Sequence, residues 1–263
     1  MSALLELAGL SRRFAGLLAV DGVEMTVARG SIHAVIGPNG AGKTTLFNLV
    51  SGVIAPSAGQ IVLDGADITG LGAERRAALG VARTFQNIRL FASMTVLENV
   101  LAGMLPRERV GLAGTVLRSR AFRAQEAASL AAARAALAVV GLADRAGQAA
   151  SDLSYGDQRR LEIARAMAPS PRLLLLDEPA AGMNPAETAA LATLVRGLRD
   201  RGATILLVEH DVHFVMGLSD HVTVLNFGRR IFDGPPAAAR RDPAVIEAYL
   251  GAGVAERLAG QPA

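Results

Sequence analysis

A glycine-rich run at positions 37–45, GPNGAGKTT, is the part of the sequence with the clearest chemical meaning. It fits the pattern G-x-x-x-x-G-K-[ST] of a phosphate-binding loop, and apolar runs precede and follow it. Such a loop needs glycine because its backbone N–H groups must wrap a phosphate chain without obstruction from Cβ atoms. The helix that follows adds the positive end of its dipole. The expected nucleotide contacts in this loop are Gly37, Pro38, Asn39, Gly40, Ala41, Gly42, Lys43, Thr44 and Thr45.

Two side chains of this loop carry chemistry of their own. Lys43 is expected to reach the β- and γ-phosphates, and the Thr44 hydroxyl to ligate Mg²⁺. Lys43 is also the only lysine in a chain whose other basic residues are all arginine. A compact ammonium on a flexible stem is not replaced by a planar guanidinium at such a position. A chance glycine-rich turn would explain neither the flanking runs nor the retained lysine.

Two carboxylates follow the apolar run at positions 173–176. An unbroken apolar run is typical of a strand buried on both faces of a parallel sheet, and ligands bind at the carboxyl ends of such strands. We therefore expect Asp177 to ligate Mg²⁺ beside the loop and Glu178 to orient the attacking water. A second apolar run, 203–208, places His210 at the same edge, near the γ-phosphate or the water. A structural hydrogen bond is the other reading of this histidine.

Four further positions give weaker local signals. Gln86 follows a strand-like run and could reach Mg²⁺ or its water, although a loop glutamine is usually structural. Ser154 and Gly156 lie at a helix start, where an N-cap and free N–H groups can meet an anion; an ordinary capped helix explains this pattern at least as well. Phe14 could stack on an adenine ring, but a lone aromatic residue more often belongs to the core.

The chain around these residues alternates strands and helices, which indicates a parallel α/β nucleotide-binding core. Short strands separated by turns are expected over residues 4–36, with one turn at Asp21-Gly22. Residues 93–140 show helical spacing without a strand pattern, which predicts a helical insertion. Its alanine- and arginine-rich part is expected to be a helix over 119–140.

The composition restricts the class of protein. At 263 residues the chain can bury a sizeable core, and no run approaches the length of a membrane span. The first residues do not resemble a signal peptide, so a cytosolic location is expected. Without cysteine there is neither a disulfide nor a thiolate metal site. The net charge of +3 and the scattered arginines argue against nucleic acid as a partner.

The order of the motifs resembles that in the ATP-binding subunits of ABC transporters. GPNGAGKTT, Gln86, LSYGDQ, LLLLDEP, AAGMNP and His210 follow one another as Walker A, Q-loop, signature, Walker B, D-loop and H-loop do in that family. Phe14 falls where the family has its adenine-stacking aromatic residue. The stretches LSYGDQRRLEIARAM, DEPAAGMNP, EHDVHFVMGLSD and DPAVIEAYLG are closer still to the LivG type, which serves branched-chain amino acid importers.

Three residues depart from the pattern of the wider family. Tyr155 and Asp157 replace a glycine and a glutamine of the signature, and Asn184 replaces the D-loop aspartate. The LivG type shares these departures.

The resemblance implies an α/β fold of the P-loop NTPase (RecA-like) kind, a parallel-sheet core with an N-terminal antiparallel β subdomain and an inserted helical subdomain. Residues 1–263 would form a single ABC ATPase domain. The nucleotide-binding core with its β subdomain would take up 1–86 and 161–263, and the helical subdomain with the signature 87–160.

The resemblance also implies a mechanism. Two ATPase subunits, two copies or sister subunits, would face each other head to tail, and ATP bound by one would be closed over by Ser154 and Gly156 of the other. The cofactors would be ATP and Mg²⁺. The residues implied as catalytic are Glu178, His210 and Lys43. The residues implied as Mg²⁺ ligands, directly or through water, are Thr44, Gln86 and Asp177.

Membrane partners follow from the same resemblance: two permease subunits and, indirectly, a periplasmic or extracellular solute-binding protein. The chain would then be peripheral, on the cytoplasmic face of the inner membrane. Arg89, Leu90 and Phe91 are the candidates for the permease contact. The ATPase never meets the solute, so branched-chain amino acids rest on the resemblance alone.

Two alternatives stay open at this point. One is an ATPase subunit for another solute, such as an amide, urea or an exported lipid. The other is a chromosome- or repair-type ABC ATPase that acts on nucleic acid. Those proteins carry very long coiled-coil or zinc-bearing insertions, whereas here roughly a hundred residues without cysteine or heptads separate the loop from the signature.

Overall fold

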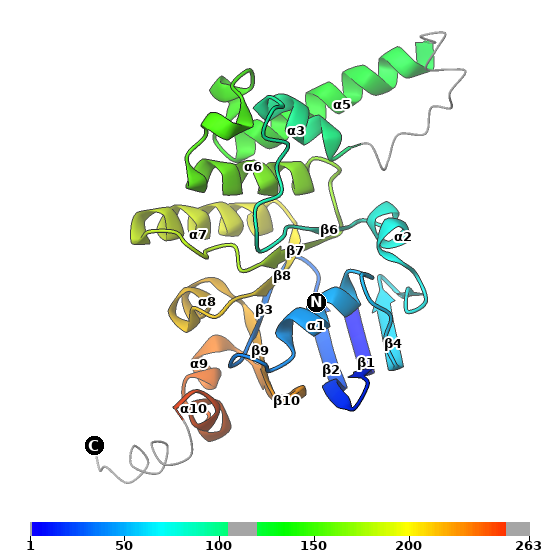
Figure 1. The fold of residues 1–263 in the computed structure, drawn as a ribbon, viewed down its shortest axis with the longest axis vertical. Coiled ribbons are helices and arrows are strands. Elements are labelled where there is room, and N and C mark those ends of the chain that lie inside the picture. The colour runs from blue at the N-terminus through cyan, green and yellow to red at the C-terminus, as the bar shows by residue number, and fades with distance from the viewer. Residues whose placement is uncertain (1, 105–119, 251–263) are drawn as a thin grey trace.

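The structure, a computed structural model, describes residues 2–104 and 120–250 (Figure 1). Its N-terminal part is an antiparallel sheet in the order β2-β1-β4-β5. The turn predicted at Asp21-Gly22 is wrong, because both residues lie inside β2. Two residues of β2 oppose one of β1 there, between the pairs Leu10–Val23 and Arg12–Val20, and Gly22 takes a φ of 60° that suits such a bulge. The strands are β1 (Ala3–Phe14), β2 (Leu17–Ala28), β4 (Ala58–Leu63) and β5 (Ala66–Asp67).

The central sheet has six strands in the order β10-β9-β3-β8-β7-β6. Its neighbours run parallel except β10, which pairs antiparallel with β9. Successive residues of β7 and β8 enter two different hydrophobic cores, which explains why these strands are apolar at nearly every position. The strands are β3 (Ile32–Ile36), β6 (Val81–Arg83), β7 (Leu173–Asp177), β8 (Thr204–Val208), β9 (His221–Asn226) and β10 (Arg229–Gly234).

Helices cover both faces of the central sheet. α1 (Lys43–Val50) shares one core with the antiparallel sheet, whereas α7 (Pro185–Asp200) and α8 (Val212–Leu218) pack on the other face. Asn184 and Glu187 form a capping box at the start of α7, as their spacing indicates. The remaining short helices are α2 (Ala73–Ala78), α9 (Pro236–Ala239) and α10 (Pro243–Leu250).

A helical layer of α3, α5 and α6 lies at the end of the molecule away from β1 and β2 (Figure 1) and has a core of its own. Residues 105–119 of the predicted insertion lie outside the described residues. Of the helix predicted over 119–140, α5 covers 120–139, and residue 140 lies in the turn that follows. α6 runs through residue 160, so the predicted division between core and helical subdomain falls inside a helix. The elements are α3 (Val96–Ala102), α5 (Arg120–Val139), α6 (Tyr155–Met167) and the 3-10 turns η2 (Ala143–Arg145) and η3 (Ala150–Asp152).

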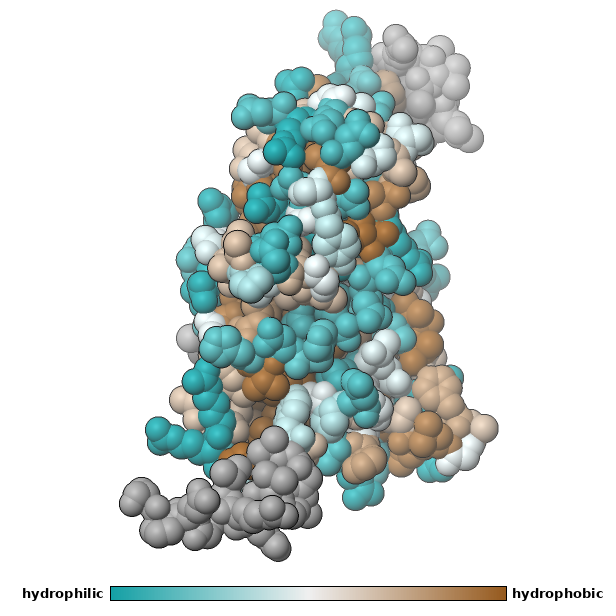
Figure 2. All heavy atoms as spheres, turned by 60° about the vertical axis from the view of Figure 1, so that its left-hand side comes forward, coloured by the Kyte–Doolittle hydropathy of each residue, from teal (hydrophilic) through white to brown (hydrophobic). Residues whose placement is uncertain are grey.

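The surface in Figure 2 is mixed, with hydrophilic side chains interspersed among smaller hydrophobic patches. In the part of the chain that the structure describes, no helix combines the length and the apolar character needed to cross a bilayer.

Candidate nucleotide-binding site

The glycine-rich loop, Gln86, Asp177, Glu178 and His210 lie at the carboxyl ends of four neighbouring strands. In the order of the sheet, β3 leads into the glycine-rich loop, β8 is followed by His210, β7 ends at Asp177, and β6 leads to Gln86. Ligands of open parallel sheets bind at this edge. Residues more than 150 positions apart in the sequence, such as Lys43 and His210, are thereby brought to one edge.

Glycine is required at two positions of the loop. Gly37 has a φ of 152°, and a Cβ there would lie 2.2 Å from the carbonyl oxygen of Leu225. Gly42 has a φ of 100°, and its Cβ would lie 2.5 Å from the carbonyl oxygen of Ala19. α1 begins directly after Gly42 without a side-chain cap, so its first N–H groups are free to receive an anion. These features fit a bound phosphate chain.

The Lys43 side chain lies inside the loop. It is 7% exposed, and its Nζ donates hydrogen bonds to the carbonyl oxygens of Gly37, at 2.7 Å, and Pro38, at 3.0 Å. Burial lowers the pKa of Lys43, and the negative charge of Glu178 counters part of this effect. Phosphate oxygens bound in the loop could therefore replace the two carbonyl oxygens as hydrogen-bond acceptors of the Lys43 ammonium group.

A cavity of about 400 Å³ opens beside the loop. Its size is in the range of small-molecule sites. It brings Lys43, Thr44 and Glu178 together, as predicted, whereas Gln86, Asp177 and His210 are not part of its lining. The lining consists of residues 39–45, Leu17, Leu18, Ala19, Glu178, Phe227 and Gly228.

Asp177 is paired with an arginine that the sequence did not single out. Arg83 Nη2 lies 2.7 Å from Asp177 Oδ2, and both side chains are nearly buried. The same guanidinium donates to Asn48 Oδ1 at 2.7 Å and to Ser51 Oγ at 2.9 Å, both near the end of α1. Arg83 therefore ties β7 to the helix that follows the phosphate loop. The one feature of the sequence that could have pointed to Arg83 is its place at the end of the short strand β6.

Glu178 lies beside groups from two other strand ends, one of which donates a hydrogen bond to it. Gln86 Nε2 donates to Glu178 Oε2 at 2.8 Å, and His210 Nδ1 lies 3.8 Å from the same oxygen. His210 Nδ1 also lies 3.6 Å from Oε2 of Glu209, which is fully buried. Burial raises the pKa of Glu209, although it accepts hydrogen bonds from the backbone N–H groups of Ala180 and His210.

The signature residues lie away from this cavity. Ser154 caps α6, as predicted, and neither it nor Gly156 lines the cavity. The Tyr155 hydroxyl donates to the carbonyl oxygen of Ala181 at 3.0 Å, and a Cβ on Gly156 would lie 3.1 Å from Glu187 Oε1. The start of α6 therefore packs against the turn before α7 of its own chain.

Phe14 is 40% exposed and does not line the cavity, whereas Leu17 and Phe227 do. Phe227 is 86% exposed and has a φ of 45° at the tip of the β9–β10 hairpin. The next residue, Gly228, donates its N–H to the carbonyl oxygen of Ala41, which joins this hairpin to the phosphate loop. No local pattern in the sequence indicates that this aromatic residue meets the loop.

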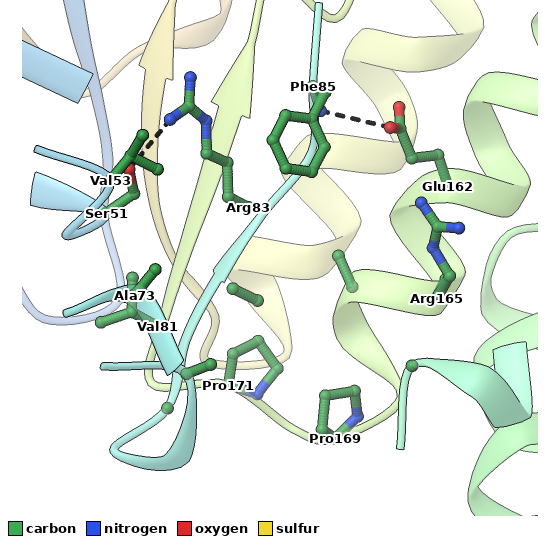
Figure 3. A pocket seen from close by; sticks show the side chains of 15 residues that line it. Ser51, Val53, Ala73, Val81, Arg83, Phe85, Glu162, Arg165, Pro169 and Pro171 are labelled. Carbon is green, nitrogen blue, oxygen red and sulfur yellow. Dashed lines mark hydrogen bonds between the residues drawn. The ribbon is translucent and has the colours of Figure 1, made fainter. Parts of the chain in front are cut away.

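A second cavity, of about 300 Å³, lies between β6 and α6 (Figure 3). Figure 3 shows Phe85 and Glu162 side by side at one end, with Pro169 and Pro171 at the other. We call this cavity the β6–α6 groove.

The fold and the site define a nucleotide-binding cassette of the P-loop class. Residues 20–181 match the family model described as ABC transporter, and residues 229–255 match the one described as branched-chain amino acid ATP-binding cassette transporter. The chain belongs to the ABC transporter family, as an ATP-binding subunit that hydrolyses ATP. Membership of this family implies membrane permease partners.

Individual relatives agree with this assignment. The chain is 47% identical to the high-affinity branched-chain amino acid transport ATP-binding proteins BraF of Pseudomonas aeruginosa and LivG of Escherichia coli K12, over 94% of this chain and 98% of each relative. Among solved structures, it resembles an ATP-binding cassette of an ABC transporter in its ADP conformation, with a TM-score of 0.83 and 28% identity, over 95% of this chain and 100% of the other. A nucleotide-free cassette gives a TM-score of 0.82 at 29% identity, with the same coverage.

Proposed function

We propose that this chain hydrolyses ATP to power the import of branched-chain amino acids through a membrane ABC transporter. One observation carries the proposal: Lys43, Thr44 and Glu178 converge on one cavity in a chain that is nearly half identical to branched-chain amino acid transport ATP-binding proteins. The convergence supports hydrolysis, and the similarity supports the solute.

The loop would bind the phosphates of ATP through its N–H groups and through Lys43. Thr44 and Asp177 offer the hard oxygen ligands that Mg²⁺ prefers, and Gln86 would reach the ion through water. When bound, Mg²⁺ would neutralise charge on the β- and γ-phosphates. Asp177 would then exchange part of its pairing with Arg83 for the ion.

Glu178 would position the attacking water and accept its proton. The water oxygen forms a bond to the γ-phosphorus while the bond from that phosphorus to the bridging oxygen breaks, and ADP leaves. Gln86, at 2.8 Å, would hold the carboxylate of Glu178 in place, and His210 would lie on the γ-phosphate side. Catalysis here is mainly positioning and stabilisation of charge.

A second ATPase subunit would complete the site. Ser154 caps the N-terminus of α6, and neither Ser154 nor Gly156 lines the cavity of its own chain, which supports a head-to-tail pair in which each subunit covers the ATP of the other. The partner would be a second copy or a sister subunit.

The β6–α6 groove is the surface that we assign to the permease. Its lining includes Phe85, the residue before Gln86, and the exposed Val53. The exposed ring of Phe91 does not line the groove, but its centroid lies 6.0 Å from the guanidinium carbon of Arg165, which does. Together with Arg89 and Leu90, Phe91 would contact one of two permease subunits. A periplasmic or extracellular solute-binding protein would act indirectly, and the ATPase would sit at the cytoplasmic face of the inner membrane. The chain would consist of a nucleotide-binding core, residues 1–86 and 161–263, and a helical subdomain, residues 87–160.

A second candidate function is lipid export. The lipopolysaccharide export ATP-binding protein LptB of Acidithiobacillus ferridurans is 36% identical over 253 residues, which is weaker support than the 47% above.

Uptake of labelled leucine, isoleucine and valine tests the solute. Cells whose only copy of this chain carries Glu178→Gln should lose uptake, and the wild-type chain should restore it. Normal uptake of all three, together with a growth defect on some other nitrogen source, would contradict the assignment of the solute and keep the ATPase.

A further inference from the structure

Two buried charged residues of α6, Arg159 and Glu162, form an ion pair at 2.7 Å. Their side chains are 0% and 1% exposed. Burying such a pair gives little net stability compared with an apolar pair of similar volume.

The pair contacts the backbone of the segment that leads to Gln86. Arg159 Nη1 donates to the carbonyl oxygen of Phe85 at 2.7 Å, and its Nη2 donates to the carbonyl oxygen of Gln86 at 2.8 Å. Glu162 Oε1 accepts from the N–H of Phe85 at 3.2 Å, as Figure 3 shows. Together the two side chains hold three backbone groups of two successive residues. We call this arrangement the Arg159–Glu162 clamp.

The clamp acts where the sheet has ended. β6 stops at Arg83, and Thr84 still bonds to β7: its N–H donates to the carbonyl oxygen of Leu175 at 2.9 Å, and its Oγ1 accepts from the N–H of Asp177 at 3.4 Å. Beyond Thr84 the backbone contacts described above come from α6. The position of Gln86 thus depends on α6 rather than on the sheet.

The place of Gln86 in turn affects the orientation of the Glu178 carboxylate, because the Gln86 side chain donates a hydrogen bond to it at 2.8 Å. One short path therefore runs from α6 through two backbone units to the carboxylate that we assign to the attacking water. The same helix begins at Ser154, which we expect to meet the ATP of a second subunit.

We propose that Arg159 and Glu162 are positioning residues for hydrolysis. They set the place of Gln86 against Glu178 according to the place of α6, so that a displacement of the helical layer changes the rate of hydrolysis. This rests on the proposed function in one respect, the role of Gln86 and Glu178 in hydrolysis.

The first test measures whether the clamp holds the segment. The double variant Arg159→Met/Glu162→Met replaces the ion pair by an apolar pair, which buried sites often tolerate. Hydrogen exchange of the peptide covering 84–88 should speed up at least roughly tenfold, while α6 keeps its protection. Arg160→Met is the matched control, because Arg160 is the next residue of α6, is 34% exposed and pairs with Asp157 at 3.4 Å. Unchanged exchange at 84–88 overturns the proposal.

The second test is a double-mutant cycle with Gln86→Ala. In the wild-type background the Met pair should lower kcat roughly tenfold and leave the KM for ATP within about twofold, because the phosphate loop is untouched. In the Gln86→Ala background the same change should lower kcat by less than about twofold. An equal loss in both backgrounds overturns the proposal, since the pair would then act on something other than Gln86.

Two controls keep the tests decisive. If the Met pair does not fold, Arg159→Lys takes its place, because a lysine cannot donate to two carbonyl oxygens and a carboxylate in the planar geometry of the guanidinium. If Gln86→Ala alone leaves kcat unchanged, the proposed role of Gln86 fails, and the exchange experiment still decides whether the clamp holds the segment.

Discussion

The side-chain amide of Gln86 donates a hydrogen bond to the carboxylate of Glu178, at 2.8 Å, although 92 positions separate the two residues in the sequence. Glu178 adopts a φ of 46°, a conformation that residues other than glycine rarely take. Such strain persists where the surrounding structure holds it, often at functional sites. Here the Glu178 N–H is bonded to the carbonyl oxygen of Val208, at 2.9 Å, and its side chain to Gln86. These two bonds give the carboxylate a defined direction.

Replacing Lys43 by alanine should weaken ATP binding by about 10–100-fold, the value of a charge-assisted hydrogen bond. Isothermal titration calorimetry with ATP measures this. Because burial lowers the pKa of Lys43, wild-type affinity should also fall as the pH rises through a value below the ordinary 10.5. Lys43→Ala has no ammonium group to deprotonate, so its residual affinity should show no such alkaline loss. Affinity that is flat up to pH 10.5 in the wild type would contradict the assignment.

Arg83→Met should destabilise the protein by about 3–5 kcal/mol in the absence of divalent ions, because Asp177 would be left buried and unpaired. Mg²⁺ should recover part of this loss, since the ion can replace the guanidinium beside the carboxylate. Urea unfolding with and without Mg²⁺ measures both effects. Arg172→Met is the control: it breaks an ion pair to Asp64 whose arginine is 56% exposed, and should change stability by less than about 0.5 kcal/mol. Equal responses of the two variants to Mg²⁺ would count against a Mg²⁺ site at Asp177.

Acid should destabilise the protein through His33. Burial, with a smaller contribution from the nearby His221, lowers the pKa of His33 from 6.5 to about 3. The unfolded chain therefore takes up a proton below pH 6.5 that the folded chain does not, and stability is lost as the pH falls toward 3. At pH 4.5 the loss should be about 3 kcal/mol. His33→Gln, which keeps a polar contact to Thr223, should lose less stability between pH 7 and 4.5 in urea unfolding. An equally steep loss in the variant would exclude His33 as the cause.

Phe14→Ala should weaken ATP binding by about tenfold, the value of one base stacked on an aromatic ring. Binding of inorganic triphosphate, which has no base, should stay the same. Phe227→Ala provides the comparison, because Phe227 lines the cavity beside the loop and Phe14 does not. If Phe227→Ala loses ATP affinity and Phe14→Ala keeps it, the exposed hairpin residue stacks on the base instead.

The features that could be predicted from the sequence are those that depend on residues close together in the chain. The apolar runs of β3, β7 and β8 give the buried strands directly, and the capping box of Asn184 and Glu187 marks the start of α7. Because parallel strands end at one edge of the sheet, the residues after β7 and β8 could also be placed beside the loop.

Contacts between distant segments explain what the sequence could not show. Arg83 meets Asp177 across 94 positions, and Arg159 meets Phe85 across 74, so neither pair leaves a local pattern. The turn predicted at Asp21-Gly22 is wrong for a different reason. A glycine with positive φ serves a bulge inside a long strand as well as it serves a turn.

The most direct measurement is ATP turnover by Glu178→Gln, together with its ATP affinity. The amide keeps the size of the side chain but cannot accept the proton of the attacking water. Turnover should fall by about 10²–10⁴-fold, while ATP binding persists and a closed pair of subunits accumulates in size-exclusion chromatography. Hydrolysis at the wild-type rate would contradict the assignment of Glu178 and the mechanism built on it.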